Sequence, residues 1–183
     1  MSDESWQAFS QRVTYVDRLP LALEPRAGDA SAAERLEERN VHVLNTLATL
    51  EERRIDAAED GGAVIQELAR LDSKLNVLMD IVGRLLTPDG SLPPRESIRL
   101  NALGAEIPAA LLPGHAGPCI LRVHFDACRA LPLMLPVLCR HPCAPARQFV
   151  VFDEQGQAVK DGLEKLVFRQ HRRKVAEARS AAS

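Results

Sequence analysis

The sequence has little excess charge and no long apolar run. Its 23 lysines and arginines nearly balance its 25 aspartates and glutamates, which gives a formal net charge of −2. A near-neutral chain is not typical of proteins that bind mainly nucleic acid or an anionic membrane, because both select basic surfaces. No apolar run reaches the length needed to cross a bilayer. We therefore expect no nucleic-acid partner and no membrane insertion.

An export signal is also missing, since no basic start precedes an apolar core at the N-terminus. The expected location is therefore the cytoplasm. Cysteine is scarce, and all four residues lie in the second half of the chain: Cys119, Cys128, Cys139 and Cys143. In a chain of this length without an export signal, such cysteines are better interpreted as reduced thiols than as a disulfide framework.

Motifs for catalysis are absent as well. The sequence contains no G-x-S-x-G elbow, no phosphate-cradling glycine loop and no H-E-x-x-H pattern, so we predict neither an enzyme nor a cofactor. Cys139, His141 and Cys143 alternate, and a continuous strand would point all three to one side, as a zinc site requires. Pro142 interrupts that strand, and free cysteines also serve as small core residues. No metal is predicted, and the role of these three residues stays open.

The chain changes character twice along its length. Residues 1–30 contain two prolines and predict an extended N-terminal arm rather than a helix. Residues 31–90 predict a helical oligomerisation segment, whose first helix starts at Ser31 with Glu34 three residues later, the pattern of a capping box. Residues 91–183 predict a barrel with a C-terminal helix.

The most regular apolar pattern lies in the second part of the helical segment. Aliphatic residues alternate there at spacings of four and three, which is typical of the a and d positions of a coiled coil. These positions are Val64, Leu68, Leu71, Leu75, Leu78, Val82 and Leu85. The same phase continues backwards through Leu47 and Val43, with Asn40 as a polar interruption, so either one long helix or a hairpin fits the pattern. Flanking apolar residues widen the face and favour a homo-oligomer of three or four chains, although the seam could also close within one chain.

Beyond residue 94 the sequence changes to short apolar runs separated by glycine and proline turns, which is typical of a small antiparallel barrel. The predicted strands cover residues 97–100, 104–107, 118–126, 130–141 and 147–152. Pro132 and Pro136 lack a backbone donor, which predicts an edge or bulged position for the fourth of these strands. Residues 158–179 predict a closing helix, with Leu166 and Phe168 covering one opening of the barrel.

The order of these parts resembles a PilZ domain over about residues 92–175. The resemblance rests on a glycine-containing second strand, the "PG" turn, two longer strands, the "VVF" strand and the closing helix "LEKLVFRQHRR". The preceding stretch "LDSKLNVLMDIVGRLL" resembles the helical oligomerisation segment of atypical PilZ proteins. The resemblance implies an α+β fold, a small antiparallel PilZ-like barrel preceded by long heptad-bearing helices. It also implies a place in cyclic di-GMP signalling, because PilZ domains as a family are receptors for this dinucleotide.

The family binds its ligand with an RxxxR segment before the first strand and a D/N-x-S-x-x-G turn. Aligning the glycine on Gly104 places Arg99 at the Asp or Asn position and Asn101 at the serine position. A guanidinium accepts no hydrogen bond, so Arg99 cannot receive the N–H groups of a guanine edge. Arg95 and Arg99 form the RxxxR match nearest the turn, but they overlap it. These four residues are therefore a degenerate ligand site at most.

The sequence predicts a non-enzymatic signalling adaptor of the PilZ type. It is expected to self-associate and to act through contacts with unidentified signalling or motility proteins, without binding cyclic di-GMP itself. Two alternatives stay open: a cyclic di-GMP receptor with a rearranged binding turn, and a purely structural assembly protein.

Overall fold

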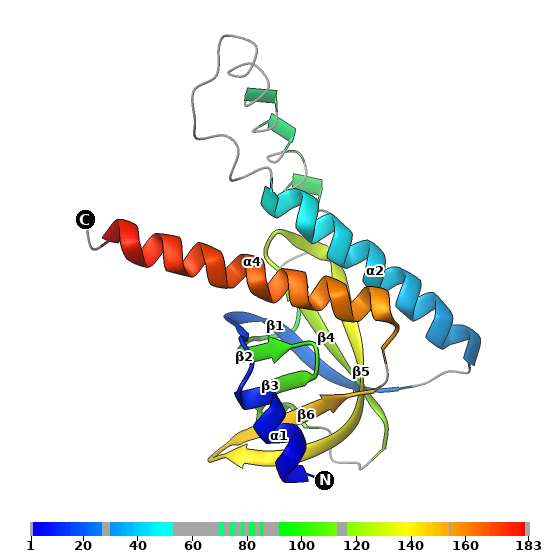
Figure 1. Ribbon diagram of the computed structural model, residues 1–183. Helices are drawn as coiled ribbons and strands as arrows, with labels where there is room; N and C mark the ends of the chain where they lie inside the picture. The colour runs from blue at the N-terminus through cyan, green and yellow to red at the C-terminus, as the bar shows by residue number, and fades with distance from the viewer. Residues whose placement is uncertain are drawn as a thin grey trace.

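The computed structural model describes residues 2–26, 30–52, 92–112, 117–153 and 155–181, together with the single positions 70, 71, 74, 75, 78, 81, 82 and 85. Its helical elements are α1 (Ser2–Ser10), α2 (Ala30–Glu52), the short 3-10 turn η3 (Ala109–Leu111) and α4 (Gln157–Ala181). Its strands are β1 (Tyr15–Pro25), β2 (Arg95–Asn101), β3 (Gly104–Pro108), β4 (Cys119–Phe125), β5 (Cys128–Ala144) and β6 (Arg147–Phe152). Figure 1 shows α2 and α4 crossing over one end of the strands, with α1 at their side.

The strands close into an antiparallel barrel in the order β1-β2-β3-β6-β5-β4. Alternate residues of each strand point inward, so Leu121 and Val123 of β4 meet Leu133 and Leu135 of β5 in the core. The antiparallel strands and the C-terminal helix predicted from the sequence are therefore confirmed. No described helix is both long enough and apolar enough to span a membrane.

The N-terminal region differs from the extended arm predicted for residues 1–30. Residues 2–10 form α1, and residues 15–25 form β1, which pairs with β2 along its first half and with β4 along its second. Leu19, Leu21 and Leu23 are buried because they alternate along β1 and face the barrel interior. The predicted domain boundary at residue 30 is wrong, because β1 belongs to the same barrel as the strands after residue 94.

α2 also packs against the barrel. Val43, Leu44 and Leu47 are buried in the common core, where α2 contacts both α4 and β5. Val43 and Leu47 are the two positions through which the heptad phase continued backwards. In α2 this seam closes within the chain, so the first helix of residues 31–90 is part of the domain core.

Asn40 explains how α2 docks on β5. β6 pairs with β5 only from Val137 onward, which leaves the edge of the first half of β5 open toward α2. The Asn40 amide accepts a hydrogen bond from the Met134 N–H at 2.9 Å and donates one to the Met134 carbonyl at 2.7 Å. Backbone groups two residues apart in a strand point to the same edge. Pro132 and Pro136 are each two residues from Met134, so the N–H groups that they lack would also have faced α2 and not a neighbouring strand. The edge position predicted from these prolines is confirmed.

α4 closes the same end of the barrel through one apolar stripe. Val159, Leu163, Leu166 and Val167 are buried. Phe168, which was expected to close the barrel beside Leu166, is 60% exposed. Consecutive helical residues are rotated by about 100°. Phe168 therefore leaves the face that its neighbour Val167 buries, and the predicted role of Phe168 in the core is wrong.

A second amide ties α4 to β1. The Gln170 side chain accepts a hydrogen bond from the Val16 N–H at 3.1 Å and donates one to the Val16 carbonyl at 3.0 Å. Val16 lies before the point where β4 begins to pair with β1, so its outer edge would otherwise lack partners. Lys174 adds a hydrogen bond to the same carbonyl at 2.7 Å. Like Asn40, Gln170 fixes a helix to an open strand edge.

The heptad positions of the second helical stretch are described only in part. Val64 and Leu68 lie outside the described residues. The others are Leu71, Leu75, Leu78, Val82 and Leu85, which are helical and have exposed fractions between 45% and 75%. Within the described part of the chain, these side chains remain open to solvent, so they present an apolar surface to the outside.

Candidate functional site

The degenerate ligand turn forms the hairpin between β2 and β3. Asn101 pairs with Gly104, and residues 102 and 103 make the turn. The Asn101 side chain is buried: its carbonyl oxygen accepts a hydrogen bond from the Leu103 N–H at 2.9 Å, and its amide donates to the Phe9 carbonyl at 3.2 Å. Both ends of the amide are therefore occupied within the chain.

Gly104 has a packing role in this hairpin. A Cβ atom at this position would overlap the Val150 carbonyl oxygen and would lie 2.7 Å from the Phe149 ring. Glycine is therefore required here because the Phe149 ring packs directly against the backbone. This contact explains why the glycine persists although the polar residues of the family pattern do not.

Arg99 belongs to a partly buried ion cluster, in which its own side chain is 37% exposed. Glu106, which is 8% exposed, accepts hydrogen bonds from Arg99 at 2.8 Å and from Arg147 Nε at 2.9 Å. Arg147 also donates to the Ser97 hydroxyl at 2.7 Å. A buried carboxylate needs such partners, since burial of an unpaired charge is costly. The guanidinium of Arg99 thus serves Glu106, its neighbour across the β2–β3 pair.

α1 seals the surface above this cluster. Phe9 is fully buried, and its ring centroid lies 4.8 Å from that of Phe149 and 5.5 Å from that of Trp6. The Arg99 guanidinium carbon lies 5.7 Å from the Phe9 ring centroid, a distance that suits a cation–π contact. The aromatic cluster Trp6–Phe9–Phe149 and the Asn101–Phe9 hydrogen bond together anchor α1 over the turn.

Arg95 is separated from the other candidate residues. It lies four residues before Arg99 on β2, roughly 13 Å away at the usual rise of a strand. Its side chain donates to the Arg18 carbonyl at 2.8 Å and to the carboxylate of Asp126. Burial acts to raise the pKa of Asp126, but hydrogen bonds and charge from Arg95 and Arg129 outweigh it and hold that pKa below its ordinary value. The RxxxR match therefore contributes two independent structural contacts and no shared ligand site.

A family model for the atypical PilZ domain, described as a cyclic di-GMP receptor, matches residues 44–180. The chain belongs to the tPilZ family. A solved PilZ domain structure from Xanthomonas campestris is similar over 96% of this chain and 97% of its own length, with a TM-score of 0.66 and 22% sequence identity. That structure is described as a new tetrameric PilZ domain self-assembled via an unusual helical bundle. A comparison with curated proteins gives no significant match.

In this tPilZ chain, β5 carries the three residues weighed as zinc ligands, Cys139, His141 and Cys143. The side chain of Cys139 lies outside the described residues, whereas His141 and Cys143 are half-buried on β5. Burial raises the pKa of Cys143, and the nearby Glu106 charge raises it further. Among the described residues, no group of three or more His, Cys, Asp or Glu side chains could hold a metal ion. Cys119, Cys128 and Cys143 form no disulfide.

His124 is a buried titratable group that the sequence did not mark as one. It lies at a bulge in β4, where the pairing with β5 shifts between Val123 and Phe125. The His124 Nδ1 atom lies 2.8 Å from the Arg129 carbonyl, which assigns the proton to Nδ1. Burial lowers the pKa of His124; the Arg129 carbonyl opposes this, and the charges of Arg122 and Arg39 add to it. The imidazole is therefore neutral at pH 7.

Sequence reasoning missed the side chains that seal the turn. Trp6 and Phe9 are three residues apart, a spacing that places both on one face of a helix and could have indicated α1. Glu106 carried no local signal, because its pairing with Arg99 depends on the register of β2 and β3. The sequence also missed Arg12, which lies beside the hairpin and at 3.9 Å from the Glu164 carboxylate of α4.

Proposed function

We propose that this tPilZ protein is a non-enzymatic signalling adaptor that does not bind cyclic di-GMP at the hairpin turn. It acts in the cytoplasm through self-association and through contacts with signalling or motility proteins. The observation that carries this proposal is that α1 occupies the surface of the turn. Asn101, Arg99 and Gly104 each serve a contact inside the chain, with Phe9, Glu106 and Phe149 respectively.

Release of the turn for a ligand would have a substantial cost. The Phe9 ring would leave a fully buried site, and Asn101 would lose a buried hydrogen bond. Burial of one large apolar side chain contributes about 1.5–3 kcal/mol, and a buried polar group without its partner costs about 1–3 kcal/mol. A ligand would need to offset both terms before any net affinity appeared.

Self-association is supported by a separate set of residues. Leu71, Leu78 and Leu85 are exposed in the single chain, and their seven-residue spacing is that of one coiled-coil position, which supports an interface between helices. The similar fold from Xanthomonas campestris is described as tetrameric and self-assembled via a helical bundle. We extend this arrangement to the present chain and propose a homo-oligomer, with a tetramer favoured over a trimer.

Calorimetric titration with cyclic di-GMP tests the ligand part of the proposal. We expect no saturable heat from the wild-type protein at tens of micromolar ligand, a limit of about −6 kcal/mol in binding free energy. The variant that carries Arg99→Asp and Asn101→Ser should also fail to bind, because it restores the family residue types without removing α1. Saturable heat from the wild type would establish the receptor alternative.

A second variant distinguishes a turn that α1 blocks from a turn whose own residues cannot bind cyclic di-GMP. Trp6→Ala with Phe9→Ala weakens the anchoring of α1 and leaves the hairpin sequence intact. If this variant binds cyclic di-GMP while the wild type does not, the receptor alternative with α1 as a plug is established and the adaptor proposal fails. Circular dichroism of each variant checks that the barrel remains folded.

A further inference from the structure

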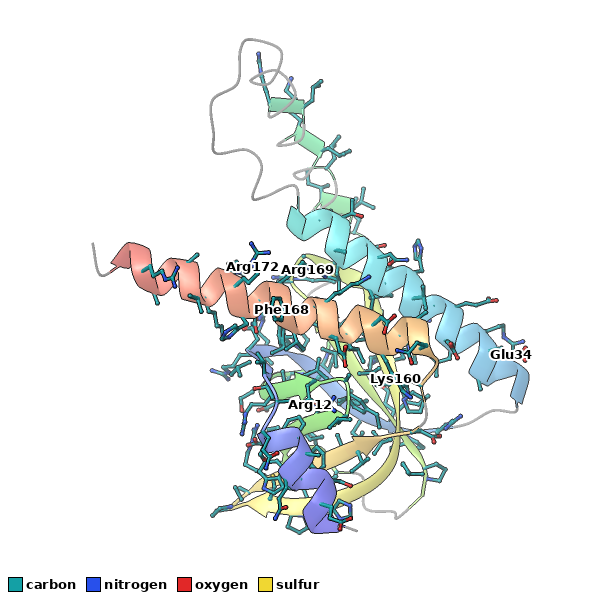
Figure 2. All side chains as sticks on the ribbon, in the orientation of Figure 1. Arg12, Glu34, Lys160, Phe168, Arg169 and Arg172 are labelled. Carbon is teal, nitrogen blue, oxygen red and sulfur yellow. The ribbon has the colours of Figure 1, made fainter. Side chains whose placement is uncertain are left out.

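The outer face of α4 carries exposed apolar side chains that the core does not use. Phe168 is 60% exposed and Val175 is 37% exposed. Residues seven positions apart lie on one face of a helix, so these two side chains form one apolar strip along α4. Figure 2 shows Phe168 on the surface of α4, with Arg169 and Arg172 on the same helix.

Two cavities flank Phe168. The first has a volume of about 220 Å³ and lies between α4, the β2–β3 hairpin and the segment that joins α1 to β1, where Arg12 contributes to its wall. The second has a volume of about 420 Å³ and runs along Lys165, Arg169 and Arg172. Phe168 and Glu164 line both cavities. A ligand on this face can therefore place apolar groups on either side of one aromatic ring.

Charge is distributed unevenly along the same face. Lys165, Arg169 and Arg172 line the second cavity beside Phe168, and residues 165–176 contain no acidic residue, in a chain whose net charge is −2. Glu164, immediately before this stretch, is exposed and lies 3.9 Å from Arg12. Along the helix Glu164 comes first, and the basic stretch from Lys165 to Arg172 follows it with the ring of Phe168 in its middle.

This mixed order distinguishes between classes of partner. A nucleic-acid backbone or an anionic membrane presents negative charge throughout, and Glu164 would repel it at one end of the site. A protein segment can present both signs of charge, with acidic groups opposite the basic stretch and a basic group opposite Glu164. An apolar side chain between them would contact Phe168, in the manner of a helix whose apolar face lies in a groove.

We propose that the outer face of α4, centred on Phe168, binds an acidic helical segment of a partner protein. The segment inserts an apolar side chain beside Phe168, places carboxylates against Lys165 and Arg172, and places a basic side chain against Glu164. This inference rests on the proposed adaptor function, for which it supplies the partner surface. Aromatic side chains with neighbouring arginines are also the usual centres of binding energy in protein interfaces.

Fluorescence anisotropy with a designed peptide tests the inference. The probe is a short labelled helical peptide with one lysine, then two leucines seven residues apart, with glutamates beside both leucines. We expect the full-length protein to bind it and Phe168→Ser to weaken binding roughly tenfold, the loss typical of a central anchor. Arg172→Glu should have a similar effect. Lys160→Glu makes the same charge change earlier on α4, about 18 Å from Arg172 and about 12 Å from Phe168 along the helix, and should leave binding within roughly twofold.

A charge swap strengthens the test. A second peptide, with lysines in place of the glutamates, should bind the Arg172→Glu variant more tightly than it binds the wild type. The inference is overturned if Phe168→Ser and Arg172→Glu both leave the affinity for the peptide unchanged. It is also overturned if single-stranded DNA or phosphatidylglycerol vesicles bind through Phe168 and the peptide does not.

Two controls separate this inference from the proposed function. If Phe168→Ser lowers the mass of the assembly in sedimentation, a second copy covers the face and the inference fails. Cyclic di-GMP binding in the calorimetric test overturns the adaptor proposal regardless of how the peptide behaves. Failure of the wild-type protein to bind the peptide overturns only the docking face and leaves the calorimetric result unchanged.

Discussion

α2 and the helical positions between residues 71 and 85 carry the same apolar repeat but have opposite environments. In α2, Val43 and Leu47 are fully buried between α4 and the barrel. In the later stretch, Leu71 is 52% exposed and Leu85 is 75% exposed. The two stretches share one heptad phase, so the pattern of apolar residues does not determine which surface a helix meets. The polar residue that interrupts the repeat is what distinguishes the two stretches, because Asn40 lies in the helix that docks on a strand edge.

The largest expected effect comes from a charge on the buried side of this comparison. Leu47→Asp places a carboxylate in the common core, where an unpaired charge costs several kcal/mol, and should unfold the domain at room temperature. Leu71→Asp makes the same change at an exposed position and should leave the fold intact. Circular dichroism with urea denaturation compares the two variants. Equal loss of stability would mean that both stretches are buried in the monomer.

The next effect concerns assembly. Leu71→Asp combined with Leu78→Asp should dissociate the proposed oligomer, since each charge would be buried without a partner at the helical interface. Sedimentation should then give a mass near the 20.1 kDa of one chain, with an unchanged circular dichroism spectrum. A wild-type mass near 20.1 kDa at micromolar concentration would show that the repeat closes within one chain.

Two phenylalanines extend the comparison to the barrel and α4. Phe125 is 3% exposed, so Phe125→Ala should lower the free energy of unfolding by about 3 kcal/mol. Phe168 is exposed, and Phe168→Ala should change it by less than about 0.5 kcal/mol. Urea denaturation measures both values. A loss below about 1 kcal/mol for Phe125 would place that residue outside the core.

Substitution of Asn40 should have a smaller effect, and the sign of the change in unfolding free energy is informative. In a coiled coil, replacement of a polar core residue by leucine raises stability. In this fold, Asn40→Leu should lower the free energy of unfolding by about 1–3 kcal/mol, because the Met134 N–H and carbonyl would lose their partner. Thermal denaturation decides between the two signs. Stabilisation would mean that α2 leaves β5 and joins a bundle.

The smallest expected effect is a dependence of stability on pH that arises from His124. Burial, with the charges of Arg122 and Arg39, lowers the pKa of His124 below its ordinary value of about 6.5. The folded state then binds the proton less readily than the unfolded state, so stability is full above about pH 6.5 and declines as the pH falls below it. His124→Gln should reduce the difference in Tm between pH 7.5 and pH 5.5. An unchanged difference would assign the pH dependence to other groups.

The sequence predicted those elements whose pattern is local. The strands after residue 94 alternate apolar and polar residues, and Pro132 and Pro136 correctly indicated an open edge along the first half of β5. β1 was missed although Leu19, Leu21 and Leu23 alternate, because its partners β2 and β4 lie far along the chain. Phe168 was misplaced by one position on α4, which is enough to move a side chain from the core to the surface.

For the candidate site, the sequence alone could show only that Arg99 has the wrong hydrogen-bonding groups for the family pattern. Hydrogen-bonding capacity alone excluded Arg99 as a substitute for a carboxylate or an amide. The sequence could not show where Arg99 goes instead, because the pairing of β2, β3 and β6 brings both Arg99 and Arg147 to the Glu106 carboxylate. The closure of the turn by Phe9 likewise depends on tertiary contacts of α1.

The position of β1 in the chain has a consequence for synthesis. Its partners are β2, where Tyr15 pairs with Leu100, and β4, where Leu23 pairs with Leu121. A ribosome adds about 5–20 residues per second, so β1 waits several seconds before β4 has left the exit tunnel. During that interval its backbone is an open edge, and the whole helical stretch is already available to other nascent chains. The proposed self-association can therefore begin before any barrel has closed, and a strand exchanged between neighbouring chains is the error to which this order of elements is most exposed.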